Sequence, residues 1–288
     1  MRSRVFPTCR ADDEGVSGVV AASLGVVLIS VLLAMVVTFW VPAWGYDNEL
    51  AHSREVLNSF GQFKNAIELQ SLSADTNQTV TTTFPLGVGA VPLFGSESPG
   101  ALSFQYLDAD KVRFRANLTD GLGQVNLSAA GSLEYYIFNR YYVPQTMAYE
   151  SGAVVIDQGG VSIMRLPPSL KIVNGSQGVE LTVSLVSLEG TPRVVTGVDS
   201  HVVTTQLTVT YTHQFTWSPL NNVTLNVTSS FNEAWGKLFN DTANRSGLDP
   251  SRYNVSQAAS QDPYTIALRL SNVRILTVTV SLVSVRLD

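Results

Sequence analysis

A run of 32 uncharged residues near the N-terminus limits what this chain can fold into. Residues 15–46 contain no Asp, Glu, Lys, Arg or His, and the stretch from Val16 to Trp40 is mostly apolar. About 20 apolar residues cross a bilayer as a helix, and a helix that is apolar on every face is rare in soluble proteins. We therefore predict a membrane-spanning helix over residues 16–46.

The length and the end of this run distinguish a helix that is retained from a signal peptide that is removed. Trp40 and Trp44 close the run, as aromatic residues do at membrane interfaces, and Pro42 predicts that the first helix bends or ends there. A secretory signal peptide has an apolar region of roughly 7–15 residues and then a small-residue cleavage site. This run is about twice as long, and no Ala-x-Ala triplet closes it. We expect the helix to stay in the mature protein.

The flanking charges predict an orientation. Arg2, Arg4 and Arg10 precede the run, whereas only Arg54 lies within the 15 residues after Trp40. Cytoplasmic flanks of membrane helices carry the excess of Lys and Arg. The sequence therefore predicts a single-pass cell membrane protein with a cytoplasmic N-terminus and an extracellular C-terminal domain.

The residues that open the helix resemble a known processing signal. A short charged leader, a Gly and then directly an apolar helix, written here Glu14-Gly-Val-Ser-Gly-Val-Val20, resemble the class III signal peptide of archaeal type IV pilins. The resemblance implies that a membrane-bound prepilin peptidase cleaves between Gly15 and Val16 on the cytoplasmic side. Cleavage there would remove the leader, residues 1–15, and with it Cys9.

The match to the pilin signal departs from the family pattern at two places. Asp13 and Glu14 stand where the family often has Lys or Arg, and Val20 stands at the fifth mature position, where Glu is common outside the archaeal members. The alternative is an uncleaved signal-anchor, which would hold the same helix in the membrane without processing.

Small residues on the predicted helix give it positions where another helix could approach closely. In a filament core, parallel copies of an apolar helix bury the surface that lipid covers before assembly. Small residues are also common in membrane helices that do not assemble. The positions that we assign to helix packing are Gly18, Ala21, Ala22 and Gly25.

An amphipathic stretch over residues 47–75 continues the helix beyond the membrane. Val56, Phe60, Phe63 and Ile67 recur at the spacing of one helical face. A single rod from residue 16 to about residue 72 would be roughly 85 Å long. The apolar stripe predicts that this part of the rod packs on the chain's own outer domain, whether or not the protein polymerises.

The remainder, residues 76–288, alternates polar and apolar residues as strands do. Residues 206–212 and 274–282 alternate strictly and are rich in β-branched residues. Adjacent apolar residues at Leu185-Val186 and Leu282-Val283 predict a β-bulge at each place. We therefore predict an α+β chain whose long N-terminal helix precedes a mostly antiparallel, β-sandwich-like domain. Further strands are expected near residues 102–107, 111–117, 132–138, 153–157, 161–166, 179–188 and 222–228.

One late segment has helical spacing instead. Phe231, Trp235, Leu238 and Phe239 predict a short helix over about residues 230–246, and Gly247 suits its C-terminal cap. Together with residues 149–155 and the Pro167-Pro168 turn, this helix is similar to the outer domains of uncharacterised archaeal pilin-like proteins.

Asn-x-Ser/Thr sequons are frequent after the apolar run. The chain has 54 Ser and Thr, which would complete about three sequons at random among its 16 Asn. All nine sequons follow the predicted membrane helix, so they predict a glycosylated exterior. The acceptors are Asn77, Asn117, Asn126, Asn174, Asn222, Asn226, Asn240, Asn244 and Asn254.

Charge and composition exclude several classes of function. A net charge of −5 and a pI near 5.2, with no Lys/Arg run, argue against nucleic acid as a partner. One Cys and three widely separated His (His52, His201 and His213) match no zinc spacing, and Asp108 and Asp110 are too few for a calcium loop. We expect no enzymatic activity, no cofactor and no metal.

These observations favour a structural role at the cell surface. The resemblance implies a subunit of an extracellular type IV pilus-like filament used for adhesion, with the membrane, other pilin-like subunits, the prepilin peptidase and the assembly machinery as partners. The alternative is a single-pass surface glycoprotein that displays a binding β-domain and does not polymerise. A third class, an anchored ectoenzyme, has no recognised catalytic motif to support it.

Overall fold

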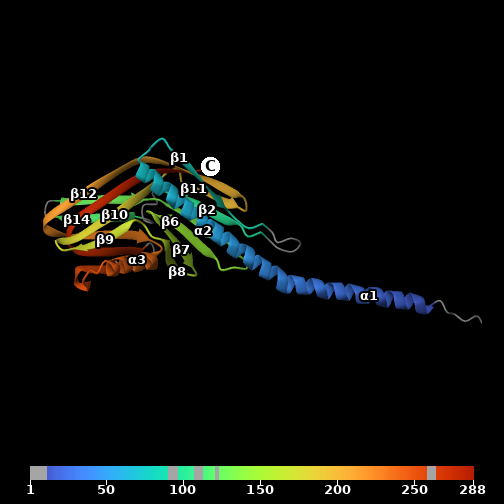
Figure 1. Ribbon diagram of the computed structural model, residues 1–288. Helices are drawn as coiled ribbons and strands as arrows, with labels where there is room; N and C mark the ends of the chain where they lie inside the picture. Colours follow the sequence, from blue (N-terminus) through green and yellow to red (C-terminus); the bar gives the residue numbers. More distant parts are fainter. Residues whose placement is uncertain (1–11, 90–96, 107–112, 121–122, 258–263) are drawn as a thin grey trace, which may run out of the picture.

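The apolar run and the amphipathic stripe form one helical rod. In this computed structural model, which describes residues 12–89, 97–106, 113–120, 123–257 and 264–288, the rod consists of α1 (Asp12–Met35), a π-helical segment (Val36–Trp40) and α2 (Val41–Ser73). Figure 1 shows α1 projecting away from the β-rich domain while α2 lies along it. The rod ends at Ala74, whose left-handed backbone lets its N–H donate to the Gln70 carbonyl.

Pro42 does not end the helix, contrary to one reading of the sequence. It lies in the first turn of α2, directly after the π-helical segment. There the N–H of Val41 donates to the carbonyl of Val36, five residues back. Proline has no N–H to give, and a single π turn is the form in which a helix accommodates such a local irregularity. The rod changes direction in this region but continues (Figure 1).

In the described ranges fourteen strands form two sheets, and the predicted α+β fold class is confirmed. The larger sheet has the order β4-β3-β12-β14-β10-β9, with β1 on β12 and β13 on β14; the smaller has the order β11-β2-β5-β6-β7-β8. All neighbours are antiparallel except β10 and β14. The larger sheet comprises β1 (Thr79–Pro85), β3 (Arg113–Asp120), β4 (Gly123–Ala130), β9 (Leu170–Gly175), β10 (Gly178–Glu189), β12 (Ser200–Ser229), β13 (Tyr253–Gln257) and β14 (Tyr264–Leu287). The smaller comprises β2 (Gly100–Gln105), β5 (Ser132–Ile137), β6 (Gln145–Glu150), β7 (Ala153–Gln158), β8 (Val161–Leu166) and β11 (Arg193–Gly197).

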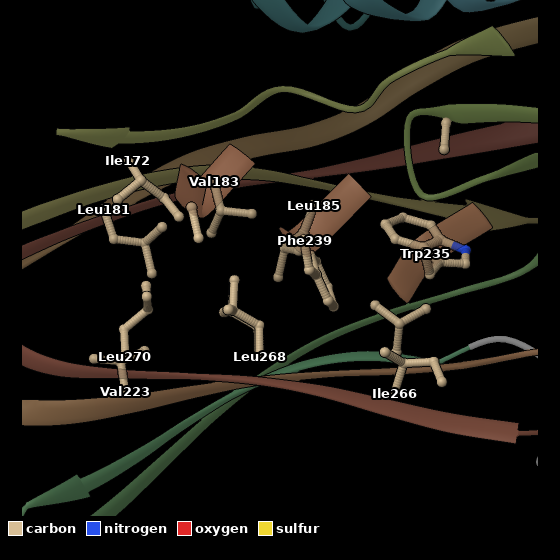
Figure 2. Close-up of a cluster of buried hydrophobic side chains, with 14 of the residues drawn as sticks. Ile172, Leu181, Val183, Leu185, Val223, Trp235, Phe239, Ile266, Leu268 and Leu270 are labelled. Atoms are coloured by element: carbon tan, nitrogen blue, oxygen red, sulfur yellow. The ribbon is translucent and has the colours of Figure 1, made fainter. Parts of the chain in front are cut away.

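Two groups of buried side chains hold these layers together. The α2 cluster joins the rod to β1, to the small sheet and to one end of the long strands. The α3 cluster joins the other part of the large sheet to α3 (Asn232–Arg245). Figure 2 shows this second cluster, in which Leu181 and Val183 of β10 face Leu268 of β14. Because β12 and β14 contribute to both clusters, they connect the rod to the rest of the domain.

The late helix matches its prediction. Trp235 and Phe239 are fully buried in the α3 cluster, and Phe231 is buried beside them. Gly247 follows the helix in a left-handed conformation, and its N–H donates to the Asn244 carbonyl. A residue with a Cβ would be strained at that backbone conformation.

One of the two predicted bulges is wrong. β10 and β14 pair without a shift at Leu185 and Val186. Both side chains are buried, the first in the α3 cluster and the second in the α2 cluster, so adjacent apolar residues there reflect burial on both faces of the strand. The register does shift opposite Leu282-Val283, where β12 carries the extra residue, Thr208.

Six strands in the described residues were not expected from the sequence. Five of them lie at an edge or pair with a single neighbour, and such strands need little apolar alternation. The sixth, β6, is central, but Met147 and Tyr149 enter the α2 cluster while Ala148 enters the α3 cluster, which removes the alternation. The six are β1, β4, β6, β9, β11 and β13.

Candidate functional site

The apolar surface of α1 is uncovered by the rest of the chain. Among the described residues, one helix is long and apolar enough to cross a membrane, and none of its most apolar stretch is buried. Large side chains such as Val19, Leu24 and Val26 are more than 60% exposed. Exposed apolar surface on this scale marks a contact with lipid or protein. The first part of the rod is therefore a candidate membrane anchor.

Two hydroxyl groups in the apolar part of α1 are hydrogen-bonded within the helix. The hydroxyl of Ser23 donates to the carbonyl of Val20, and the hydroxyl of Ser30 donates to that of Val26, each at 2.8 Å. In hydrocarbon an unpaired polar group is expensive, so these internal hydrogen bonds fit a helix surrounded by lipid.

The four residues assigned to helix packing share one face of α1. At 100° per residue, Gly18, Ala21, Ala22 and Gly25 fall within about 100° of arc. A side chain added at Gly18 or Gly25 would meet no other atom of the chain within 4 Å. The chain itself thus leaves this face open, and its use by another helix stays a prediction.

The predicted processing site lies at the beginning of the rod. Gly15 and Val16 belong to α1, which begins at Asp12. Cys9 and most of the leader lie outside the described residues, as do Asp108 and Asp110. Cleavage between Gly15 and Val16 remains an expectation from the resemblance.

A buried carboxylate fixes the membrane end of α2 to the β-domain. Glu49 is 1% exposed and accepts hydrogen bonds from the hydroxyl of Ser98 and from the backbone amides of Arg140, Tyr141 and Tyr142, at 2.5–2.8 Å. Burial alone raises the pKa of this carboxyl, but the hydrogen bonds together outweigh burial and lower it below its ordinary value. Glu49 is therefore a charged anchor for the loop after β5, residues 138–144.

Aromatic contacts close this loop onto the rod. A Cβ at position 45 would lie 2.2 Å from the ring of Tyr141, so only glycine permits this approach. The rings of Tyr46 and Tyr142 meet edge to face with centroids 5.3 Å apart. The loop thus contacts Gly45, Tyr46 and Glu49, which lie within about one turn of α2.

One turn further along, His52 continues the attachment. Its Nε2 lies 3.0 Å from the hydroxyl of Tyr135, which itself donates to the carbonyl of Leu86. Nε2 must then donate to the tyrosine oxygen, which requires a protonated Nε2. Burial lowers the pKa of His52, against the opposing charges of Glu55 and Glu49, so the ring is held neutral.

The predicted stripe forms the middle of the interface. Val56, Phe60, Phe63 and Ile67 are all fully buried in the α2 cluster. The ring of Phe60 meets that of Phe84 edge to face at 5.1 Å, and Phe63 meets Tyr149 in the same way at the same distance. The prediction that the second half of the rod packs on its own domain is confirmed.

Two polar side chains fix the far end of the rod. Lys64 is buried and donates to the carbonyl of Gly152 at 2.7 Å, while also pairing with Glu68. The amide of Gln70 donates to the carbonyls of Gln78 and Thr205, each at 3.1 Å. The β-domain therefore contacts α2 from Gly45 to Gln70.

The acceptor asparagines are concentrated on one part of the domain. Six of the seven with a described side chain are exposed, and the seventh, Asn226, is half-buried. Asn77 lies in the turn before β1, and Asn117 and Asn126 lie in β3 and β4. The others lie in the large sheet or α3, so the small sheet and the rod carry no sequon.

A second buried carboxyl lies between the two clusters. Glu150 is 1% exposed, and both Ser229 and Trp235 donate to its Oε2. Burial raises the pKa of Glu150 to about 8, against the lowering effect of these hydrogen bonds. It links β6 to the residues that lead into α3, which is a structural role.

The histidines do not form a site in the part of the chain that the structure describes. His52 lies in α2, whereas His201 and His213 lie far apart along β12. No three residues among the described His, Cys, Asp and Glu are placed so that they could hold a metal ion.

Sequence reasoning missed Glu49 and His52 as parts of the junction. Both lie on the stripe that continues through Val56, at helical spacing. A charged residue in line with an apolar stripe signals a buried partner, and that signal was available.

Comparison with known protein families matches residues 142–286, just over half of the chain. The matched family is DUF7289, a family of unknown function. The chain belongs to this family. The match begins inside the loop that binds Glu49 and covers β6 to β14, hence nearly all of the α3 cluster and just under half of the α2 cluster. Comparisons with curated proteins and with solved structures gave no match.

Proposed function

We propose that this protein is a pilin-like structural subunit of an extracellular filament used for adhesion. The observation that carries the proposal is the contrast along one rod: α1 is apolar and uncovered, while α2 is held by its own domain from Glu49 to Gln70. Before assembly, α1 would anchor such a subunit in the membrane, with the N-terminus in the cytoplasm and the β-domain outside the cell.

Assembly would exchange one apolar environment for another. In the membrane, lipid covers α1; in a filament, the helices of neighbouring subunits would cover it. The face that carries Gly18 and Gly25 is open and would let a neighbouring backbone approach. Other subunits, the prepilin peptidase and the assembly machinery are the partners that this proposal requires.

A second candidate is a single-pass surface glycoprotein that does not polymerise. The exposure of six of the seven described sequon asparagines favours an extracellular, glycosylated domain in either case. The two candidates differ in whether α1 ever leaves lipid, so the test must address helix packing.

The Gly25→Leu variant makes that distinction. A Cβ at position 25 has no other part of the chain within 4 Å, and leucine keeps the helix apolar, so insertion into the membrane should be unchanged. Between packed helices it should cost about 1–3 kcal/mol at each contact. We expect the variant to remain in membranes and to be lost from sheared filament fractions.

Val27→Leu provides the matched control, because position 27 lies about 200° around the helix from position 25. This variant should assemble like the wild type. Absence of wild-type protein from the sheared fractions would refute the filament and leave the anchored glycoprotein. An N-terminus at Val16 in the membrane-extracted protein would support processing, and retention of Met1–Gly15 would contradict the pilin assignment.

A further inference from the structure

We propose that the base of the β-domain is itself a membrane-binding surface, seated in the lipid headgroup layer. The inference rests on the proposed placement of α1 in the membrane. We call this surface the aromatic collar; each of its members is between 44% and 66% exposed. Its residues are Phe39, Trp40, Trp44 and Tyr46 on the rod, and Phe138 and Val143 on the 138–144 loop.

The fold fixes the collar at a defined height along the rod. Glu49 binds three successive amides of the loop, and the ring of Tyr141 covers Gly45. The loop cannot leave the helix without breaking these contacts. Its exposed side chains, Phe138 and Val143, are therefore carried at the level of the first turns of α2.

That height coincides with the membrane interface. A hydrocarbon core of about 30 Å takes about 20 helical residues, and each headgroup layer adds about 5–7 Å. As a helix, the uncharged residues 16–46 rise about 45 Å, close to the 40–45 Å of a bilayer with both headgroup layers, so Trp44 and Tyr46 at the end of the run lie in the outer headgroup layer. The loop, which contacts Gly45 and Tyr46, thus reaches the headgroup layer.

The chemistry of the collar fits lipid headgroups. Trp, Tyr and Phe are the side chains enriched at membrane–water interfaces, where an apolar ring can be buried while polar edges stay hydrated. No sequon lies on the rod or on the small sheet that leads into the loop, so no predicted glycan would separate this surface from the bilayer.

The test measures depth in a bilayer, with the full chain in nanodiscs of phosphatidylcholine and phosphatidylglycerol at one chain per disc. Cys9→Ser removes the sole cysteine, and a spin label is then attached through Phe138→Cys, Val161→Cys or Leu28→Cys. Val161, on β8, is the matched control because it is 55% exposed and Phe138 is 58% exposed. Collision rates with oxygen and with a water-soluble nickel chelate report the depth of each label.

We expect the label at 138 to show an oxygen-to-nickel ratio several-fold higher than the label at 161, and the label at 28 to be deepest. A label at Val143, with Ile163 as its control, repeats the comparison while Phe138 is intact.

Each of three results would overturn one claim. If the label at 28 is buried but the label at 138 is as open to nickel as the label at 161, the collar is refuted and the anchor stands. If the label at 28 is itself open to nickel, the membrane placement of α1 fails. If position 138 is shielded in assembled filaments but not in single-chain discs, the collar binds a second copy rather than lipid.

Discussion

The two halves of the rod are one helix in two different environments. Along α2, the β-domain covers an apolar stripe, a carboxylate and a lysine, each with a partner from a strand or loop. Along α1 the chain offers no cover, although α1 is far more apolar. The difference shows that the β-domain is built around the second half of the rod only. The cover for the first half must come from lipid or from other chains.

The boundary between the halves is marked in the backbone. The π-helical segment Val36–Trp40 separates them, and Glu49 begins the series of buried anchors two turns later. If the two halves are independent, a substitution in α2 should affect the stability of the β-domain and a substitution in α1 should affect membrane insertion.

The largest effect should come from the covered half. Phe63→Ala removes a fully buried ring that contacts Phe84 and Tyr149, and should lower the free energy of unfolding of the β-domain by about 3–5 kcal/mol. Leu69→Ala, on an exposed position of the same helix, should change it by less than about 0.5 kcal/mol. Denaturant titration measures both. Equal losses in the two variants would contradict the role of the stripe.

The uncovered half should fail in a different assay. Leu28→Asp places a charge in the middle of the predicted span and should weaken membrane insertion by about 2.5–3.5 kcal/mol. Leu72→Asp, at the exposed far end of α2, should insert normally. Carbonate extraction of membranes separates the two outcomes. Normal insertion of Leu28→Asp would show that lipid does not cover α1.

The junction should be sensitive to acid. Glu49 has a lowered pKa in the folded protein, so its contribution is present above the ordinary carboxyl pKa and is lost as the pH falls through the lowered value. Glu49→Gln should cost about 1–3 kcal/mol at neutral pH because an amide nitrogen cannot accept from the loop. The variant should also lose this acid dependence, while Asp47→Asn, at an exposed position, should keep it. Melting temperatures across pH 3–7 test both.

Glu150, away from the junction, should show the opposite pH dependence. Its folded pKa of about 8 is above its unfolded value, so its contribution is complete below the unfolded pKa and is lost as the pH rises to about 8. The slope should be at most about 1.4 kcal/mol per pH unit. Glu150→Gln should flatten stability between pH 5 and 8. An unchanged slope in this variant would assign that pH dependence to another group.

The sequence predicted the features that follow from periodicity. The apolar run, the stripe through Phe60 and Phe63, and the helix around Trp235 all have the repeat of their secondary structure. The sequence did not predict contacts that depend on tertiary approach. The position of Glu49 in line with the stripe indicates burial but not its partner, the loop at 138–144, and β6 loses its alternation because clusters on both of its faces bury it.

The same limit explains why the sequence left a bend or an end open at Pro42, and why the bulge predicted at Leu185 was wrong. A proline stops a helix only if the backbone cannot adapt, and here the π turn before it does so. Adjacent apolar residues signal a bulge in a strand with one buried face, but β10 is buried on both faces at Leu185 and Val186. Neither condition can be read from local sequence.

The most direct test of the difference between the two halves is to remove the uncovered one. We predict that residues 41–288, which begin with α2, form a soluble monomer without detergent, and that their melting temperature stays within about 3 °C of that of the full chain in lipid. We predict that residues 16–288 require lipid or detergent. Loss of cooperative unfolding in the shorter chain, or a detergent-free monomer of the longer one, would contradict the claim that α1 is covered only from outside the chain.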